Sequence, residues 1–122
     1  MMAKGDDIQQ RLTVFGVKIM DLCDSLPPTN TGKHLSGQLL RSGTAGAPNY
    51  AEARGAESRE DFIHKLGVVL KELNETEVWL EKLLLRRMVP DDTILPLRQE
   101  CNELCKIIAV SRRTAREGRM LK

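Results

Sequence analysis

A few cysteine, histidine and carboxylate side chains are spaced so that they could bind a metal ion. Asp61 and His64 form an Asp-x-x-His pair, the aspartate counterpart of the Glu-x-x-His pair that di-iron four-helix bundles carry twice. Cys101 and Cys105 are four residues apart and face one way if their segment is a helix. Neither pair has the further ligands that a metal ion needs at local spacing. We therefore expect buried cysteines and no metal or other cofactor. These two pairs are the basis of one of three functional hypotheses, a metal-dependent bundle enzyme; the other two are given below.

Motifs that would indicate an enzyme are absent from the sequence. It contains no Walker phosphate-binding loop, no Gly-x-Gly-x-x-Gly turn, no His-Glu-x-x-His pair and no Gly-x-Ser-x-Gly elbow. The two histidines, His34 and His64, have no spacing that makes a catalytic dyad. The sequence predicts a protein that is not an enzyme and has no catalytic residues.

Basic residues are concentrated near the C-terminus. Residues 104–122 hold six basic residues against one acidic residue, which is +5, whereas the whole chain carries +2. Arginines on successive helical turns bind phosphates as bidentate donors, although cations at a helix C-terminus also stabilise the helix without any partner. No aromatic residue lies between these arginines, so base stacking is not indicated. The predicted phosphate contacts are Arg112, Arg113, Arg116 and Arg119, with Arg41 and Arg54 as second candidates.

Apolar residues recur at alternating steps of four and three in three segments of the chain. This spacing places them on one stripe of a helix. It predicts helices over residues 6–26, 58–88 and 92–117, with the first ended by Pro27 and Pro28. Ser58 precedes two acidic residues and is the expected N-cap of the middle helix of these three.

The remaining segment, residues 32–55, has a weaker helical pattern. Gly43 and Gly46 weaken a helix but let a neighbouring backbone approach closely, and Pro48 removes one backbone donor. We expect a helix with a bend or looser turn near Pro48; a loop that separates two short helices is the alternative. Its polar residues form either a buried network between helices or subunits, or an exposed face. These residues are Arg41, Asn49, Glu52 and Arg54.

Four amphipathic helices joined by short links predict an all-α fold. The expected architecture is an antiparallel up-down-up-down four-helix bundle with left-handed packing, in one domain over residues 1–122. An aromatic content of 3% suits packed helices better than a β-sandwich. The chain has no signal peptide and no apolar run long enough to span a membrane, and its three cysteines are an odd number. We therefore expect a reduced, cytoplasmic protein that does not enter a membrane.

Several apolar residues lie off the main helical stripes. They either widen the core stripe of each helix or contact another subunit. The off-stripe residues are Val14, Val17, Val68, Val78, Trp79 and Leu85. The predicted oligomer interface consists of Trp79, Val68, Val78 and Tyr50. A surplus of apolar surface around Trp79 also favours a second hypothesis, a protein–protein interaction scaffold without affinity for nucleic acid.

Much of the chain resembles a known family of bacterial proteins. The matching runs are residues 38–44 (QLLRSGT), 49–53 (NYAEA), 58–67 (SREDFIHKLG), 72–76 (ELNET) and Trp79-Leu80. They are similar to the four-helix-bundle proteins encoded in intervening sequences of bacterial large-subunit ribosomal RNA genes. One departure is Ala45-Gly46, where the family usually has Ser followed by an aliphatic residue.

The resemblance implies a four-helix bundle that assembles as a ring-like homopentamer. It also implies kinship with the accessory proteins of diversity-generating retroelements, which look like basic pentamers that bind a reverse transcriptase and nucleic acid. No catalytic residues come with the family. The leading hypothesis is therefore a non-enzymatic pentamer that acts as a nucleic-acid or ribonucleoprotein accessory. Its expected partners are copies of itself, RNA or single-stranded DNA, and a reverse transcriptase.

Overall fold

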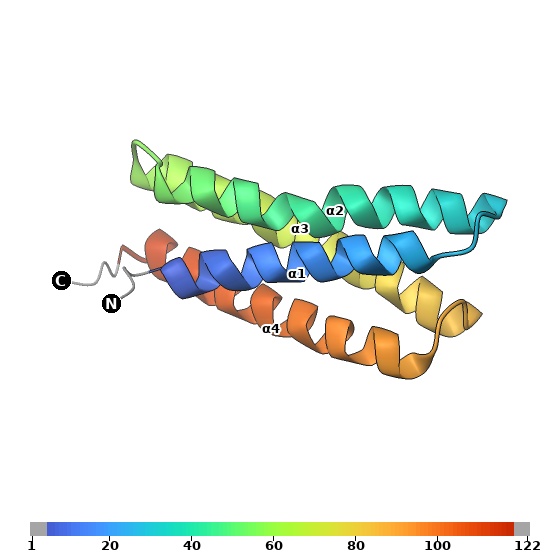
Figure 1. Ribbon diagram of the computed structural model, residues 1–122. Helices are drawn as coiled ribbons and strands as arrows, with labels where there is room; N and C mark the ends of the chain where they lie inside the picture. The colour runs from blue at the N-terminus through green and yellow to red at the C-terminus, as the bar shows by residue number, and fades with distance from the viewer. Residues whose placement is uncertain (1–4, 119–122) are drawn as a thin grey trace.

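The computed structural model describes residues 5–118, which form four α-helices packed around one core (Figure 1). The helices are α1 (Asp6–Ser25), α2 (Asn30–Arg54), α3 (Arg59–Arg86) and α4 (Asp91–Arg116). Each runs antiparallel to the one before it, and residues 5–118 contain no strand. The predicted all-α up-down-up-down bundle is confirmed, and the helices end within two residues of the predicted bounds. No helix among these residues is long and apolar enough to cross a membrane.

The starts of α2 and α3 are fixed by side-chain caps. The Thr29 hydroxyl accepts a hydrogen bond from the Gly32 amide at 3.1 Å, and the Ser58 hydroxyl accepts one from the Asp61 amide at 3.0 Å. Each cap satisfies an amide that has no partner within its helix, which typically stabilises a helix by about 1 kcal/mol. Glu60 and Asp61 place negative charge at the positive end of α3. The predicted Ser58 cap is confirmed.

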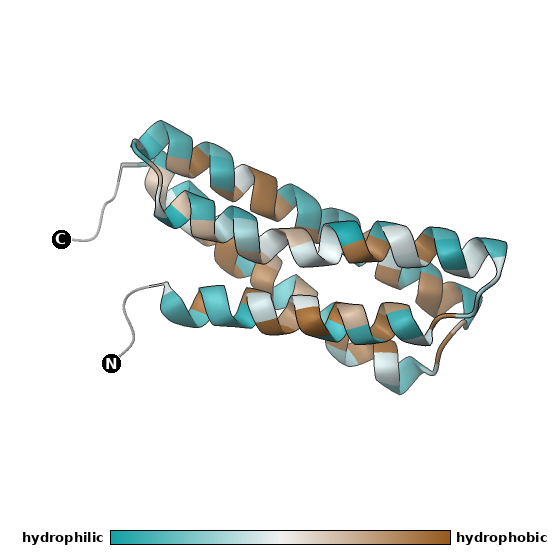
Figure 2. Cartoon of the chain, turned by 45° about the horizontal axis from the view of Figure 1, so that its top comes forward, coloured by the Kyte–Doolittle hydropathy of each residue, from teal (hydrophilic) through white to brown (hydrophobic). Residues whose placement is uncertain are grey.

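The core is built from the predicted apolar stripes. In Figure 2 hydrophobic patches recur along the helices between hydrophilic ones. Fully burying a Leu, Ile or Phe side chain contributes about 1.5–3 kcal/mol, so these stripes are the main source of stability. The largest side chains that are completely covered include Leu12, Phe15, Ile19, Leu39, Leu66, Leu73, Leu80, Leu83, Ile94, Leu104 and Ile108.

α2 continues through Pro48 as a single helix. The alternative of a loop between two short helices is wrong. Residues on both sides of the proline, Gly46 and Tyr50, are buried against the rest of the bundle, and this packing outweighs the one backbone hydrogen bond that proline removes. The Asn49 amide reinforces the helix by donating to the Ala45 carbonyl at 2.8 Å. A bend at this point stays a prediction.

Glycines allow α1 and α2 to pack closely. A Cβ atom on Gly43 would lie 2.7 Å from Cγ2 of Ile19, and one on Gly46 would lie 3.1 Å from Leu12. At the first of these distances something must shift, so only glycine fits Gly43's position without movement. The predicted close approach of a neighbouring helix at these small residues is confirmed.

Candidate functional site

A charged and aromatic cluster lies on the outer side of the α2–α3 pair. We call Arg41, Glu72, Glu75 and Trp79 the α2–α3 polar cluster. The Arg41 guanidinium of α2 forms ion pairs with Glu72 of α3 at 3.1 Å and with Glu75 one turn along. Because Arg41 is half exposed, these ion pairs fix geometry more than they add stability.

Trp79 extends the cluster toward the far end of α3. Its indole nitrogen donates to Glu75 at 3.3 Å. The His34 ring meets the indole edge-to-face with centroids 6.0 Å apart, and the Lys82 ammonium lies 4.6 Å from the ring centroid. A cation over an indole face is a favourable contact of about 0.5–1 kcal/mol at an exposed site. The half-buried tryptophan is therefore held in one orientation at the protein surface.

A buried hydroxyl pair lies beneath the cluster. The Ser42 and Thr76 hydroxyls are hydrogen-bonded to each other at 2.8 Å, and neither residue is exposed to solvent. This pair joins α2 and α3 through groups that would each cost about 1–3 kcal/mol if buried without a partner. The polar residues of two separate sequence runs, 38–44 and 72–76, thus meet at one seam.

The predicted phosphate-binding arginines occupy different environments. Arg113 and Arg116 are exposed on the last turns of α4. Arg112 is half-buried and donates from Nε to the Ile63 carbonyl of α3 at 3.2 Å. Its guanidinium lies against Gly67, where a Cβ would approach it to 3.1 Å. Arg112 therefore ties α4 to α3, whereas Arg113 and Arg116 of the same helix face solvent.

The other arginines predicted to contact phosphate either form ion pairs or lie outside residues 5–118. Arg54 forms an ion pair with Asp6 at 2.7 Å, and Arg41 belongs to the α2–α3 polar cluster. Arg119 lies outside residues 5–118. Among the described residues, Arg113 and Arg116 are the members of the predicted set that are exposed and form none of these ion pairs.

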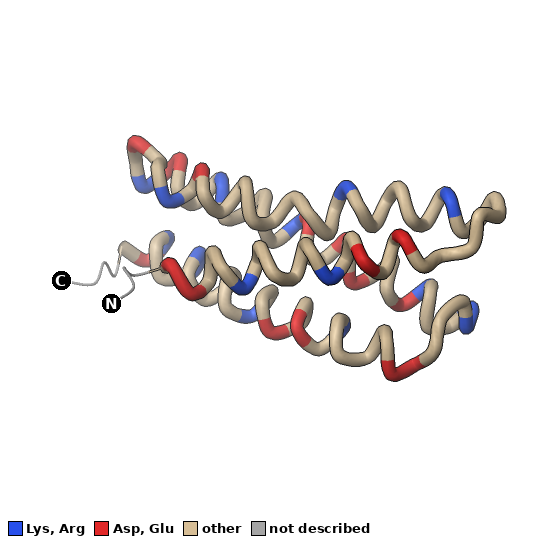
Figure 3. Tube along the Cα trace, in the orientation of Figure 1, with Lys and Arg blue, Asp and Glu red and all other residues tan. Residues whose placement is uncertain are grey.

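Antiparallel packing also changes the charge around the end of α4. The N-terminus of α1 brings Asp6 and Asp7 to this end of the bundle, and the N-terminus of α3 brings Glu60 and Asp61. Figure 3 shows acidic and basic residues mixed there. Residues 104–122 carry a net charge of +5 in the sequence, but the described residues at this end of the bundle do not form a uniformly basic surface.

A family model described as 23S rRNA-intervening sequence protein matches residues 5–110. The chain belongs to this family. The solved structures include a protein of unknown function from the S23 ribosomal protein family of Bacteroides thetaiotaomicron. It is 34% identical, has a TM-score of 0.82, and the match covers 88% of this chain and 99% of that one. No curated protein matches the chain.

Three of the four residues predicted for an oligomer interface in this 23S rRNA-intervening sequence protein reach its surface. Val78 is 54% exposed, and Val68 and Trp79 are half-buried. Tyr50 is only 8% exposed and belongs to the core of the chain. It faces inward because it shares the buried face of α2 with Gly43, and burial raises the pKa of its hydroxyl. Tyr50 therefore packs mainly within its own chain, and its place in a subunit interface stays a prediction.

A second exposed apolar region lies on α1 of this family member. Val14, Val17 and Met20 are 44%, 51% and 48% exposed, and Leu40 of α2 is 44% exposed. The sequence did not predict that Met20 and Leu40 are exposed. Each follows a buried residue of the apolar stripe, Ile19 or Leu39, so its position is compatible with a broader buried face of the helix. These side chains give the protein another apolar surface besides the one around Val78.

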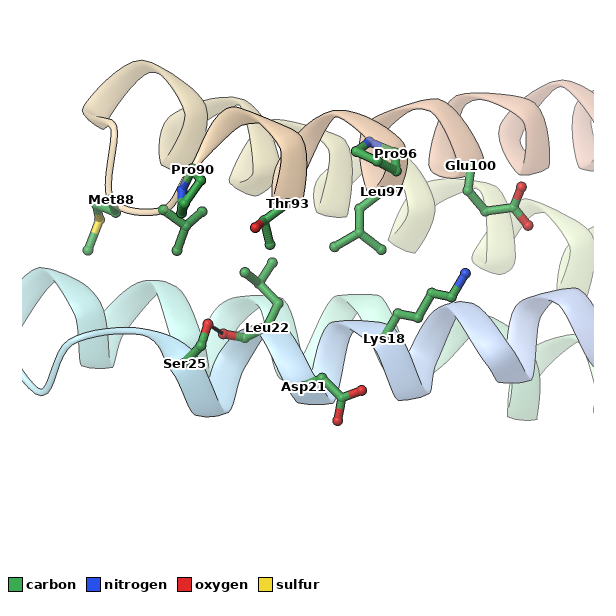
Figure 4. Close-up of a pocket in the computed structure, with 11 residues that line it drawn as sticks. Lys18, Asp21, Leu22, Ser25, Met88, Pro90, Thr93, Pro96, Leu97 and Glu100 are labelled. Atoms are coloured by element: carbon green, nitrogen blue, oxygen red, sulfur yellow. Dashed lines mark hydrogen bonds between the residues drawn. The ribbon is translucent and has the colours of Figure 1, made fainter.

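The bundle also has a groove between α1 and α4, with a volume of about 600 Å³. Leu22 and Leu97 point into it from facing helices, with Lys18 and Glu100 toward one end (Figure 4). The groove contains no cysteine or histidine and no pairing of a nucleophile with a base.

The polar residues considered for a network form separate pairs in the 23S rRNA-intervening sequence protein. Besides the Arg41 and Arg54 pairs, Glu52 accepts from Lys65 at 2.7 Å and Asn49 bonds within its own helix. No single network of these residues exists among residues 5–118. Arg41, Glu52 and Arg54 are exposed and Asn49 is half-buried, so of the two alternatives the exposed face is confirmed and the buried network is wrong.

The cysteine pair has a further ligand that sequence spacing could not show. Glu77 of α3 lies beside Cys101 and Cys105 of α4. Among the described residues, these three side chains form a group that could hold a metal ion. The contact between the two sulfurs lowers the pKa of Cys105, while it raises the pKa of Cys101 together with burial. Asp61 and His64 are not part of any such group in residues 5–118.

Proposed function

We propose that this 23S rRNA-intervening sequence protein is a non-enzymatic, cytoplasmic bundle that assembles with copies of itself and binds nucleic-acid phosphates. The single observation that carries the proposal is the pair Arg113 and Arg116, one turn apart and exposed at the end of α4. Guanidinium groups at this spacing suit successive phosphates of RNA or single-stranded DNA. The ring size of five comes from the family resemblance.

Assembly would compensate for the small number of phosphate-binding arginines on each chain. Two arginines of one chain release few counterions and give weak binding. Five copies would present about ten such arginines, five times two, and linked sites bind far more tightly than separate ones. Acidic residues around the site, such as Asp6 and Glu60, would limit binding to phosphates that can reach the exposed α4 side.

Salt-dependent binding tests the nucleic-acid part of the proposal. Fluorescence anisotropy with labelled RNA and single-stranded DNA is measured across a salt series for the wild type and for Arg113→Gln with Arg116→Gln. Affinity should fall with salt, and the double variant should bind weakly with a shallower salt slope. Arg41→Gln is the matched control, because Arg41 is already paired with Glu72 and Glu75. Salt-independent binding, no binding, or equal loss in the control contradicts the proposal.

Exposed apolar side chains favour a second function, a protein-interaction scaffold without affinity for nucleic acid. Val17 and Met20 of α1 and Val78 of α3 are each about half exposed, and such surfaces mark protein contacts. The partner implied by the family resemblance is a reverse transcriptase. Recovery of one defined protein after nuclease treatment, with no anisotropy change on adding RNA, would favour the scaffold.

Self-assembly has its own test at the α3 surface. We expect Val78→Asp to lower the oligomer order in multi-angle light scattering, because a charge would be buried at the contact. Trp79→Ala should have the same effect through loss of the ordered indole. Val110→Asp is a matched control on α4, where Val110 is 50% exposed. A monomeric wild type, or unchanged assembly in both α3 variants, would remove Val78 and Trp79 from the interface.

A further inference from the structure

A cluster of two thiols and one carboxylate lies between α3 and α4, away from the exposed arginines. The Sγ atoms of Cys101 and Cys105 and a carboxylate oxygen of Glu77 all lie within 4.8 Å of one another. The two cysteines come from successive turns of α4, and Glu77 comes from α3. This is the spacing of ligand atoms that converge on one small ion.

The surroundings of these groups separate them from ordinary buried cysteines. Cys101 is completely buried and its thiol donates to the Leu73 carbonyl at 3.2 Å. The Oε2 atom of Glu77 is buried and has no hydrogen-bond partner among the described residues. A buried carboxylate oxygen without a donor is costly, and the cost is removed when a cation binds. The packing of two buried thiols does not by itself explain why a carboxylate lies next to them.

We propose that Cys101, Cys105 and Glu77 bind a thiophilic divalent cation, of which Zn²⁺ is the ordinary biological example. Two sulfur ligands select such an ion over Mg²⁺ or Ca²⁺, which take oxygen ligands only. On binding, each thiol passes its proton to solvent and the metal takes up the thiolate. A fourth position is open to water or to the Asn74 side-chain oxygen, which lies 3.5 Å from the Cys105 sulfur.

The proposed ion has a structural role. Because two ligands come from α4 and one from α3, a bound ion would cross-link these helices. It would stabilise the folded state over the unfolded chain, in which the three ligands are not held together. This site is independent of the proposed nucleic-acid function, since its ligands lie between α3 and α4 and are separated from Arg113 by two helical turns or more along α4.

Metal titration of the full chain tests the proposal. Reduced, metal-free protein is titrated with Co²⁺ in the presence of a phosphine reductant, and the thiolate-to-metal charge-transfer absorption is followed. We expect saturation at one equivalent, displacement of Co²⁺ by Zn²⁺, and a rise in Tm on adding Zn²⁺. Cys105→Ser should abolish the absorption. Glu77→Gln should weaken Co²⁺ binding about tenfold or more.

Matched variants keep the test decisive. Cys23→Ser removes the thiol that lies on α1, away from the cluster, and Glu81→Gln removes the carboxylate one turn beyond Glu77, which pairs with Arg98 at 2.7 Å. Both controls should bind Co²⁺ as the wild type does. Cys105 is chosen over Cys101 because it is only half-buried, and circular dichroism checks that each variant folds. The proposal is overturned by a wild type without charge-transfer absorption, by absorption that survives Cys105→Ser, or by equal loss in Cys23→Ser.

Discussion

The two sides of α1 are held to the bundle in different ways. Toward α2, the contact is mainly steric: Gly43 lets Ile19 approach to a distance that leaves no room for a Cβ, and the Arg54–Asp6 ion pair lies only at the end of this contact. Toward α4, the contact is electrostatic: the Arg11 guanidinium meets Glu100 at 2.6 Å and Glu103 at 3.1 Å, beside the groove described above.

The difference shows how sequence specifies two kinds of helix seam. A glycine on one helix lets the other helix approach closely and exclude water. Adding a side chain at that position destabilises the fold, because the close-packed interior cannot make room for it. Long charged side chains bridge helices that are further apart, and they do so in contact with water, where ion pairs contribute little. We therefore expect variants on the α2 side of α1 to change stability more than variants on its α4 side.

The largest effect is expected for Gly43→Ala. Its Cβ would lie 2.7 Å from the Ile19 side chain, so the variant should lose about 1–3 kcal/mol of unfolding free energy. Chemical denaturation at a fixed protein concentration measures this loss. Gly37→Ala is the control on the same helix, since its Cβ would meet nothing within 4 Å, and it should gain about 0.5–1 kcal/mol. Equal gains in both variants would show that α1 and α2 are not closely packed.

An intermediate effect is expected for Arg11→Met. The substitution keeps much of the aliphatic stem but removes the ion pairs with Glu100 and Glu103. Because the arginine side chain is 36% exposed, solvent screens the pair and the loss should be about 0.5–1 kcal/mol. Denaturation at low and high salt measures the loss, which should shrink as salt rises. A loss larger than that of Gly43→Ala would reverse the comparison.

The smallest effect is expected for Gln9→Met. The Gln9 amide donates to the Ala47 carbonyl of α2 at 2.8 Å, while its Oε1 is buried without a hydrogen-bond partner. Removing a favourable hydrogen bond together with a buried oxygen that has no donor should change stability by less than about 0.5 kcal/mol. Thermal denaturation checks this value. A loss above about 1.5 kcal/mol would mean that hydrogen bonds, and not steric fit, hold the α1–α2 seam.

The fold was predictable because each helix carries its own information. The steps of four and three through Leu12, Phe15 and Ile19 place buried residues on one stripe, and all three are buried. The Ser58 cap is equally local, since its partner Asp61 is three residues away. The continuity of α2 through Pro48 was not predictable in the same way, because packing on Gly46 and Tyr50 decides it.

The candidate sites depended on which residues the helices bring together. Arg112 looked like part of a basic tail, but it bonds to Ile63 of α3. Cys101 and Cys105 looked short of ligands, but Glu77 reaches them from another helix. In both cases the deciding partner is remote in sequence, and its position requires the register of α3 against α4. The spacing of one segment contains no information about that register.

The up-and-down path brings the ends of the described chain, residues 5 and 118, to the same end of the bundle, opposite the links that follow Ser25 and Arg86. A short flexible peptide would therefore join them without crossing the bundle, and new termini could be opened in the link between α3 and α4. A circular permutant made in this way should keep the native helix contacts. It would also present a fused domain at the pole of the molecule opposite Arg113 and Arg116.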